Sequence, residues 1–383
     1  MVKFGIYIHW PFCESKCPYC DFNSHVSETI DQAAWADAYL AELDRYAEET
    51  TGRTVTSVFF GGGTPSLMTA GTVRAVLGRI EDNWQVSEDL EATAEANPSS
   101  AEMEQFEAFR EAGVNRLSLG MQSLEDEALI FLGRRHSVAE AIRAASEAVQ
   151  VFDRYSLDFI YARPGQTAAA WREELARILE LAGDHVSLYQ LTIEPGTQFH
   201  KDRVPAAGEE VAAELFEITQ EMSSDAGLPA YEISNHARPG EESRHNLVYW
   251  YGEDYLGIGP GAHGRLSTAA AGQVIATETV QEIRLPEDWL SAVQSGTGGT
   301  QKRVQLARKE RLEELILMGL RLSEGIDFER FSRLFGAQLL DQLETEKLDR
   351  LIDGGFLFLE DNKLGATAEG RNRLNAVLAS LLT

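Results

Sequence analysis

Six short apolar segments alternate with amphipathic segments along the first 225 residues of the chain. The apolar segments are residues 4–10, 56–60, 90–96, 116–121, 155–161 and 185–193. The segments between them repeat apolar residues three and four positions apart, as amphipathic helices do. Six consecutive β-α units require a parallel sheet with right-handed crossovers. The pattern allows a doubly wound open sheet or a barrel, and in either fold the functional site lies at the carboxyl ends of the strands.

Residues with distinctive chemistry end or follow these predicted strands. They are Cys13–Cys20, Gly61–Pro65, Glu95–Pro98, Gln122, Asp158 and Glu194–Thr197. Glycines after a buried strand let a backbone approach a ligand closely, although they also form ordinary tight turns. Polar residues at strand ends can likewise be caps or turn-formers. Their shared position at one end of the sheet favours a ligand site.

The three cysteines of the chain, Cys13, Cys17 and Cys20, lie within eight positions of one another. An odd number of cysteines argues against a disulfide framework. Thiolates at this spacing bind zinc, an iron–sulfur cluster or Cu(I). A structural zinc site would need a fourth ligand, for which His9 and His25 are the nearest histidines. A [4Fe–4S] cluster held by three cysteines would leave one iron open to a substrate.

Composition narrows the class of protein. The chain has 44% hydrophobic and 25% charged residues, which is typical of a soluble globular protein. Its net charge of −27 argues against nucleic acid and against anionic lipid, because both attract basic surfaces. The acidity predicts a solvated surface, with the steering of a positively charged partner as the alternative. No apolar stretch has the length of a membrane helix and no signal-like segment precedes Phe4, so we expect a cytoplasmic protein.

The chain divides into a large and a small predicted domain. Residues 1–263 contain the β-α units and an extension that follows them. Residues 264–304 are rich in alanine, serine, threonine and glycine, and we predict a loosely structured connector with a short helix near 287–295. The pattern of apolar residues in 305–383 predicts three helices, a β-hairpin and a last helix. This order of elements is typical of a winged-helix-like α+β domain. Without basic clusters, a lid or docking role is favoured over DNA binding.

Histidine, tyrosine, tryptophan and glycine are concentrated in three motifs. These are Tyr231–Ala237, His245–Trp250 and Tyr255–His263. One interpretation is an aromatic core patch with hydrogen-bonded histidines. The other is a flat aromatic pocket with an axial imidazole, which suits a porphyrin or haem.

The cysteine motif, with Tyr19 directly before the last cysteine, resembles the signature of the radical S-adenosylmethionine (SAM) superfamily. Together with the other motifs, it makes the chain similar over nearly its whole length to the haem-chaperone branch of that superfamily, HemW. The other motifs are Tyr7–Cys13, Phe60–Ser66, His245–Trp250 and Leu256–His263. The resemblance implies a partial (β/α)6 barrel, a [4Fe–4S] cluster on Cys13, Cys17 and Cys20, and SAM chelating the open iron.

The resemblance also implies roles for individual residues. Gly62, Gly63 and Thr64 would contact the amino group of SAM. Glu95, Gln122, Arg134 and Asp158 would surround SAM, and Tyr7 and Tyr19 would flank the cluster and the adenine. Among the histidines of the three aromatic motifs, we predict His245 as the axial ligand of haem, with His236 and His263 as alternatives.

Two differences separate the chain from the related oxygen-independent coproporphyrinogen III oxidase, HemN. Phe22 stands where the oxidase pattern has a fourth cysteine, and the oxidase carries a long segment ahead of the first strand. A local departure from related chains is Ala162-Arg163 in place of Gly-Leu.

The resulting expectation is a haem chaperone without coproporphyrinogen oxidase activity, which passes haem to membrane haemoproteins such as respiratory cytochromes. The alternatives are the oxidase itself and a structural zinc protein. The sequence does not decide between a monomer and a homodimer.

Overall fold

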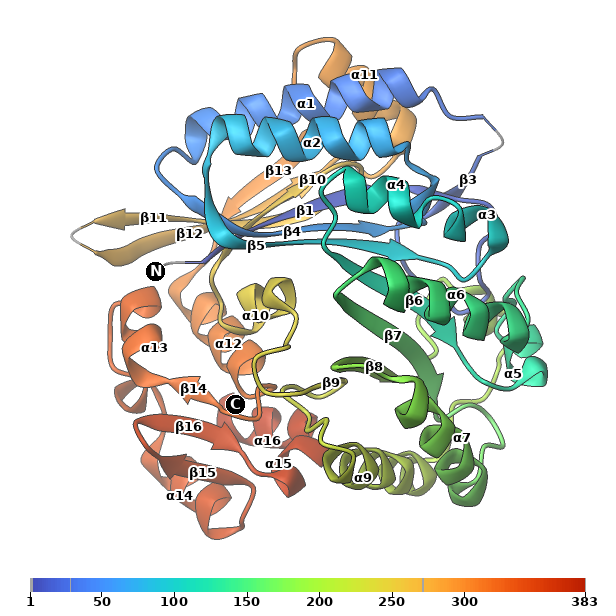
Figure 1. Ribbon diagram of the computed structural model, residues 1–383. Coiled ribbons are helices and arrows are strands. Elements are labelled where there is room, and N and C mark those ends of the chain that lie inside the picture. Colours follow the sequence, from blue (N-terminus) through green and yellow to red (C-terminus); the bar gives the residue numbers. More distant parts are fainter. Residues whose placement is uncertain (1–2, 28, 271, 383) are drawn as a thin grey trace.

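The computed structural model describes residues 3–27, 29–270 and 272–382 (Figure 1). Met1, Val2, Glu28, Ala271 and Thr383, which belong to the predicted domain ranges, lie outside the described residues. An eleven-stranded sheet forms the centre of the molecule. From edge to edge its strands are β13 (Thr300–Gln305), β12 (Gln273–Glu282), β11 (His263–Ala270), β10 (Asp254–Ile258), β1 (Phe4–Trp10), β4 (Thr54–Gly62), β5 (Gln85–Ala96), β6 (Arg116–Gln122), β7 (Arg154–Tyr161), β8 (His185–Gln190) and β9 (Asn235–Ala237).

The six predicted strands are confirmed as β1, β4, β5, β6, β7 and β8, which lie side by side and run parallel. The sheet does not close into a full barrel, because β1 pairs with β10 and β8 pairs with β9 instead of with each other. This open, curved sheet confirms the predicted partial barrel. A separate short pair, β2 (Phe12–Cys13) and β3 (His25–Val26), brackets the cysteine loop.

Helices cover the outer face of the sheet (Figure 1). The helices of this region are α1 (Gln32–Glu49), α2 (Ala70–Asn83), α3 (Ser100–Met103), α4 (Phe106–Glu111), α5 (Asp126–Phe131), α6 (Val138–Val151), α7 (Ala168–Leu181), α8 (Gln198–Lys201), α9 (Glu209–Asp225), α10 (Arg244–Trp250) and α11 (Pro286–Gln294), with a 3₁₀ turn at Pro65–Leu67. Side chains at the starts of several helices accept hydrogen bonds from backbone N–H groups, which fixes where those helices begin. They are Asp31, Thr69, Ser137 and Thr167. No helix in the described part of the chain is both long and apolar enough to cross a bilayer.

The two faces of the parallel strands differ in character. On β4, Val58 and Phe60 face outward and join the main hydrophobic core beneath the helices. The alternate residues Ser57 and Phe59 face inward, since successive side chains of a strand point to opposite faces. The outer face therefore holds the fold together, and the inner face is left to line a cavity.

The expectation of a loosely structured connector at 264–304 is wrong. Strands β11, β12 and β13 extend the central sheet in an antiparallel arrangement, and only the predicted short helix is confirmed, as α11. Trp289 of α11 is fully buried and stacks on Trp35 of α1, with ring centroids 5.6 Å apart. The small residues that suggested a loop are tolerated because β11 and β12 form a projecting hairpin with many exposed positions (Figure 1). The domain boundaries themselves stay predictions.

The C-terminal part forms its own hydrophobic core. Its elements are α12 (Arg308–Gly319), β14 (Ile326–Asp327), α13 (Phe328–Phe335), a 3₁₀ turn at Leu340–Gln342, α14 (Thr345–Asp353), β15 (Leu357–Glu360), β16 (Lys363–Ala366), α15 (Ala368–Asn372) and α16 (Leu374–Leu382). The predicted hairpin is confirmed, and Asp361 and Asn362 form its turn with positive φ angles. The predicted helix 338–353 begins instead at Thr345.

Polar contacts attach this small domain to the residues around α10. Arg321 pairs with Glu232 at 2.9 Å and lies over the ring of Trp250, and Arg311 donates to the carbonyl of Gly252 at 2.7 Å. The C-terminal domain therefore rests on the segment that bears the motif His245–Trp250.

Replacing Trp289 with alanine tests whether residues 264–304 belong to the main core. We expect Trp289→Ala to lower the free energy of unfolding by about 3–5 kcal/mol, because it removes a buried ring and the donor to Glu282. Leu285→Ala, at a side chain that is 57% exposed, is the control and should change it by less than about 0.5 kcal/mol. Denaturant titration measures both. Equal, small effects would mean that the segment is a loose connector after all.

Candidate functional site

A cavity of about 760 Å³ lies inside the curve of the parallel strands. At one end it is bounded by the cysteine loop, and at the other by residues near the beginnings of β6 and β8. Most of the residues singled out in the sequence line it. They are Tyr7, Cys13, Cys17, Tyr19, Cys20, Gly62, Gly63, Thr64, Glu95, Gln122, Arg134, Asp158 and His245. The prediction that the motifs at the strand ends meet in one place is therefore confirmed.

Cys13 ends β2, and Cys17 and Cys20 lie on the loop that follows it. Each sulfur has a hydrogen-bonding neighbour from a different element. Thr64 donates to Sγ of Cys13 and Arg134 donates to Sγ of Cys17, both at 3.5 Å, while Sγ of Cys20 lies 3.7 Å from the hydroxyl of Ser24. Burial raises the pKa of the Cys13 and Cys20 thiols, so a bound cation is needed to favour their thiolate forms.

This donor set fits an iron–sulfur cluster better than a single zinc ion. Within the described residues, no three histidine, cysteine or acidic side chains are arranged to hold one metal ion. A cluster binds each thiolate through a different iron, so the three sulfurs need not converge on one point. His9 is also engaged already, because its ring nitrogens contact the hydroxyl of Tyr7 at 3.1 Å and the carbonyl of Asn23 at 2.9 Å.

The glycine motif packs directly against the cysteine-bearing segment. The backbone N–H groups of Gly63 and Thr64 donate to the carbonyls of Trp10 and Phe12 at 2.6 and 2.8 Å. A Cβ at residue 63 would lie 2.5 Å from the carbonyl oxygen of Phe12, and residue 62 has a φ of 112°. The glycines are therefore needed for the backbone to pass this close, whatever ligand they contact.

Two carboxylates face the cavity beyond the glycine motif. Asp158 accepts hydrogen bonds from Ser118 at 2.5 Å and from Ser156 at 2.9 Å. Glu95 accepts one from the backbone N–H of Gly62 at 3.2 Å. Burial, together with repulsion from Asp158, raises the pKa of Glu95 to about 8, against the opposing effect of the Gly62 hydrogen bond. Glu95 is consequently protonated near neutral pH unless a cationic ligand stands beside it.

Arg134 connects the cysteine loop to the strand ends. Besides Cys17, its guanidinium contacts the carbonyl of Gly120 at 3.2 Å and the side chain of Asn97. Gln122 ends β6 with a φ of 67°, a backbone conformation that is uncommon for residues other than glycine and that often marks a functional site. Tyr19, on the cysteine loop, packs near Phe199.

An aromatic wall borders the same cavity. Phe59 stacks on His245 with ring centroids 5.1 Å apart, and Tyr7 stacks on both at 6.2 and 6.4 Å. Both ring nitrogens of His245 have partners, since Nδ1 lies 2.9 Å from the hydroxyl of Ser57 and Nε2 lies 2.7 Å from that of Tyr249. Burial lowers the pKa of His245 to about 3, which keeps the imidazole neutral.

The two alternative histidines lie elsewhere. Neither His236 nor His263 is among the described residues that line the cavity. His236 is buried on β9, whereas His263 is exposed at the start of β11.

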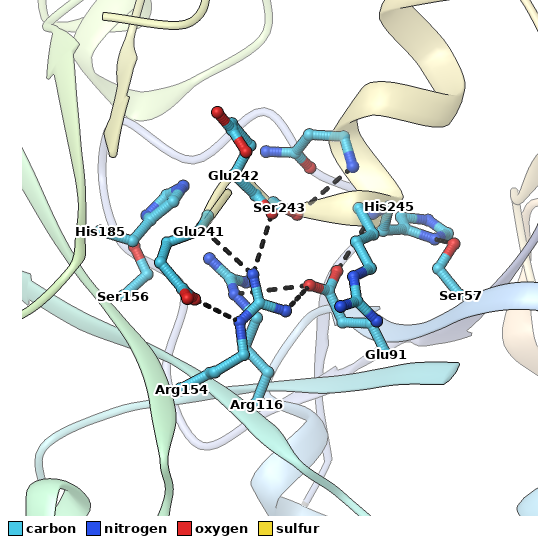
Figure 2. Close-up of polar contacts among 12 residues, drawn as sticks. Ser57, Glu91, Arg116, Arg154, Ser156, His185, Glu241, Glu242, Ser243 and His245 are labelled. Carbon is cyan, nitrogen blue, oxygen red and sulfur yellow. Dashed lines mark hydrogen bonds and ion pairs between the residues drawn. The ribbon is translucent and has the colours of Figure 1, made fainter. Parts of the chain in front are cut away.

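A network of charges lies around Arg116 and His245, two residues that line the inner end of the cavity (Figure 2). Arg154 donates to Glu91 at 2.5 Å and to Glu241 at 2.9 Å, and it also reaches the backbone carbonyls of Glu241 and Glu242. Glu91 in turn accepts the backbone N–H of His245 at 3.1 Å. The network therefore ties β5 and β7 to the segment that leads into α10.

Several cavity residues were missed from the sequence. They are Phe59, Arg116, His185 and Tyr189, whereas Asn97, Asn246 and Tyr249 lie inside the predicted motifs Glu95–Pro98 and His245–Trp250 but were given no role of their own. The sequence does contain a signal for some of them. From Arg116 to Gln122, β6 alternates polar and apolar residues, whereas a strand buried on both faces is apolar throughout. The alternation marks Arg116 and Ser118 as inward-facing. Phe59 of the aromatic wall gives no such signal, whereas its neighbours Tyr7 and His245 were predicted.

Comparisons with known proteins agree with this site. The family description "Radical SAM superfamily" matches residues 7–182, and "HemN C-terminal domain" matches residues 306–372. Among curated relatives, "Heme chaperone HemW" of Escherichia coli is 34% identical over 380 residues, which cover 99% of this chain and 98% of the relative. "Radical S-adenosyl methionine domain-containing protein 1, mitochondrial" of Danio rerio is 37% identical over 388 residues, covering 100% and 87%. The solved structure of coproporphyrinogen III oxidase (HemN) from Escherichia coli superimposes with a TM-score of 0.80 at 20% identity, covering 99% and 90%, and supports the fold.

The fold, the cysteine loop and these matches define a radical SAM protein with a HemN-type C-terminal domain. Membership of this superfamily implies a [4Fe–4S] cluster and SAM. At 32–34% identity to curated HemW proteins over nearly their full length, the chain belongs to the HemW family.

The raised pKa of Glu95 has a measurable consequence for stability. The folded state keeps a proton on Glu95 that the unfolded state loses near pH 4 to 5, so the unfolding free energy should fall as the pH rises from about 5 to about 8. Glu95→Gln has no carboxyl group to lose this proton. The stability of this variant, measured by thermal unfolding, should therefore fall less than that of the wild type between about pH 5 and about pH 8. Glu147→Gln, at an exposed position of α6, is the control and should follow the wild type. Parallel curves for all three proteins would contradict a buried, protonated Glu95.

Proposed function

We propose that this protein is a cytoplasmic haem chaperone, which binds haem in the cavity and passes it to haemoproteins of a membrane. The observation that carries the proposal is the full-length similarity to proteins named heme chaperone, at 34% identity in the Escherichia coli case. The cavity adds support, because its size lies within the usual range of ligand sites and one wall is a stack of aromatic rings. The exposed Phe22, in place of the oxidase's fourth cysteine, also favours a chaperone.

Under this proposal, Cys13, Cys17 and Cys20 hold a [4Fe–4S] cluster. When bound, such a cluster supplies an open iron for SAM and, once reduced, an electron for cleaving its sulfonium. Arg134 orients the Cys17 sulfur through its hydrogen bond, and Thr64 does the same for Cys13. Glu95, Gln122 and Asp158 surround the space next to this loop, where Glu95 would ionise beside a sulfonium or ammonium group.

Anaerobic reconstitution with iron and sulfide, followed by two titrations, tests the function. With haem, we expect an absorbance change that saturates at a single haem per chain. With coproporphyrinogen III, SAM and a reductant, we expect no decarboxylated product by chromatography. Product formation would identify the protein as an oxidase, and a colourless preparation that holds zinc would support the zinc alternative.

His245 is the proposed axial ligand, because it lines the cavity and its imidazole is neutral, as metal coordination requires. Coordination would require it to give up either Ser57 or Tyr249. We expect His245→Ala to lose the haem absorbance spectrum and added imidazole to restore it, whereas the exposed control His263→Ala keeps it. An unchanged spectrum in His245→Ala would remove His245 as the ligand.

A further inference from the structure

We propose that the inner end of the cavity is a carboxylate-binding subsite centred on Arg116, which would hold a carboxylate side chain of a porphyrin whose ring lies against the aromatic wall. The identity of that porphyrin as haem rests on the proposed function. The subsite is separate from the cysteine loop and from the residues assigned to SAM.

Arg116 lies at the end of β6 that is far from the cysteine loop. It begins β6, and Ser118, Gly120 and Gln122 follow on the same inward face. Gln122, at the opposite end of the strand, is six residues away, or about 20 Å at ~3.3 Å per residue. A ligand that touches Arg116 is therefore well below the mouth of the cavity.

The guanidinium of Arg116 is buried but poorly paired. The residue is 2% exposed, yet it lines the cavity. Among the described residues its guanidinium makes no hydrogen bond, and its one ion pair joins Nε to Glu91 at the long distance of 4.0 Å. Neighbouring Arg154 contrasts with it, because Arg154 donates to two carboxylates and two carbonyls (Figure 2). A guanidinium that lines a cavity with unused hydrogen-bond donors is suited to an anionic ligand.

Glu91 does not need the hydrogen-bond donors of Arg116. One carboxylate oxygen of Glu91 accepts from Arg154 and the other from the backbone N–H of His245. Glu241, the second carboxylate on Arg154, is 38% exposed at its side chain and therefore solvated. The cluster thus contains two guanidinium groups and two carboxylates. Both carboxylates accept hydrogen bonds from Arg154, and Glu91 also accepts the backbone N–H of His245, so the donors of Arg116 have no hydrogen-bond acceptor among the described residues.

The neighbours of Arg116 suit a flat, acidic ligand. His245, whose N–H bonds Glu91, is also the inner ring of the aromatic wall with Phe59 and Tyr7. A planar ring against this wall would direct an acidic edge toward Arg116. Asp158, an acidic side chain that also lines the cavity, already accepts hydrogen bonds from Ser118 and Ser156, which reduces its repulsion of an incoming carboxylate. Arginine matches a carboxylate through two parallel hydrogen bonds.

Binding of haem and of haem dimethyl ester, which lacks free carboxylates, tests the subsite. In the wild type we expect the acid to bind about tenfold to a hundredfold more tightly than the ester, the range of a charged hydrogen bond. In Arg116→Gln this preference should disappear through weaker binding of the acid alone. Arg116→Lys keeps the positive charge that compensates Glu91 but loses the planar guanidinium, which can form two parallel hydrogen bonds. In this variant the preference for the acid should be intermediate. Arg110→Gln, the same change at a half-exposed arginine of α4, is the matched control and should keep the full preference.

Because the acid-to-ester ratio is taken within each variant, a general loss of folding would not imitate the expected result. A preference that survives in Arg116→Gln, or an equal loss of both ligands in Arg116→Gln and Arg116→Lys, would overturn the subsite.

The same pair of titrations with coproporphyrin III and its tetramethyl ester separates the two proposals. Arg116-dependent binding of this acid without any binding of haem would refute the chaperone and keep the subsite. Binding of neither acid by the wild type would overturn both.

Discussion

The buried carboxylate of Glu91 is the interaction on which the interior of this molecule depends. It lies on β5, accepts hydrogen bonds from Arg154 on β7 and from the backbone of His245, and approaches Arg116 on β6. Burial alone would raise the pKa of Glu91, but the charges of Arg116 and Arg154 and the backbone N–H groups lower it, so the group stays ionised. An open sheet has no closing strand to hold its two sides together, and this network of charges connects three strands and the segment before α10 at the inner end.

That arrangement has consequences at a distance. It fixes His245 beside Phe59 and Tyr7, which creates the aromatic wall, and it anchors the segment on which the C-terminal domain rests. At the opposite end, the glycine motif performs a comparable task by packing without side chains against Trp10 and Phe12, which positions the cysteine loop. Polar contacts therefore lie at both ends of the cavity, among charged side chains at the inner end and between backbone groups at the cysteine loop.

The β-α alternation predicted the six parallel strands, because each apolar strand must be covered and each helix carries one apolar face. The cysteines and strand-end residues were also predictable, since parallel strands bring their carboxyl ends together. The strands at 263–305 were not, because their small and exposed residues lack an alternating pattern and their order comes from long-range partners such as Trp35 and Tyr46. Arg116 was missed for a related reason: a polar residue at the beginning of a strand resembles a solvated end until the sheet is seen to curve around it.

Transfer of haem to a membrane cytochrome is the most direct test of chaperone function. The reconstituted protein would be loaded with haem, separated from free haem and mixed with vesicles that contain a haem-free membrane cytochrome, and the spectra of the vesicles and of the soluble fraction would then be recorded. A chaperone predicts that the haem spectrum moves from the soluble fraction to the cytochrome faster than haem exchanges from a protein such as albumin. Haem that stays in the soluble fraction, or that moves no faster than from albumin, would contradict the account.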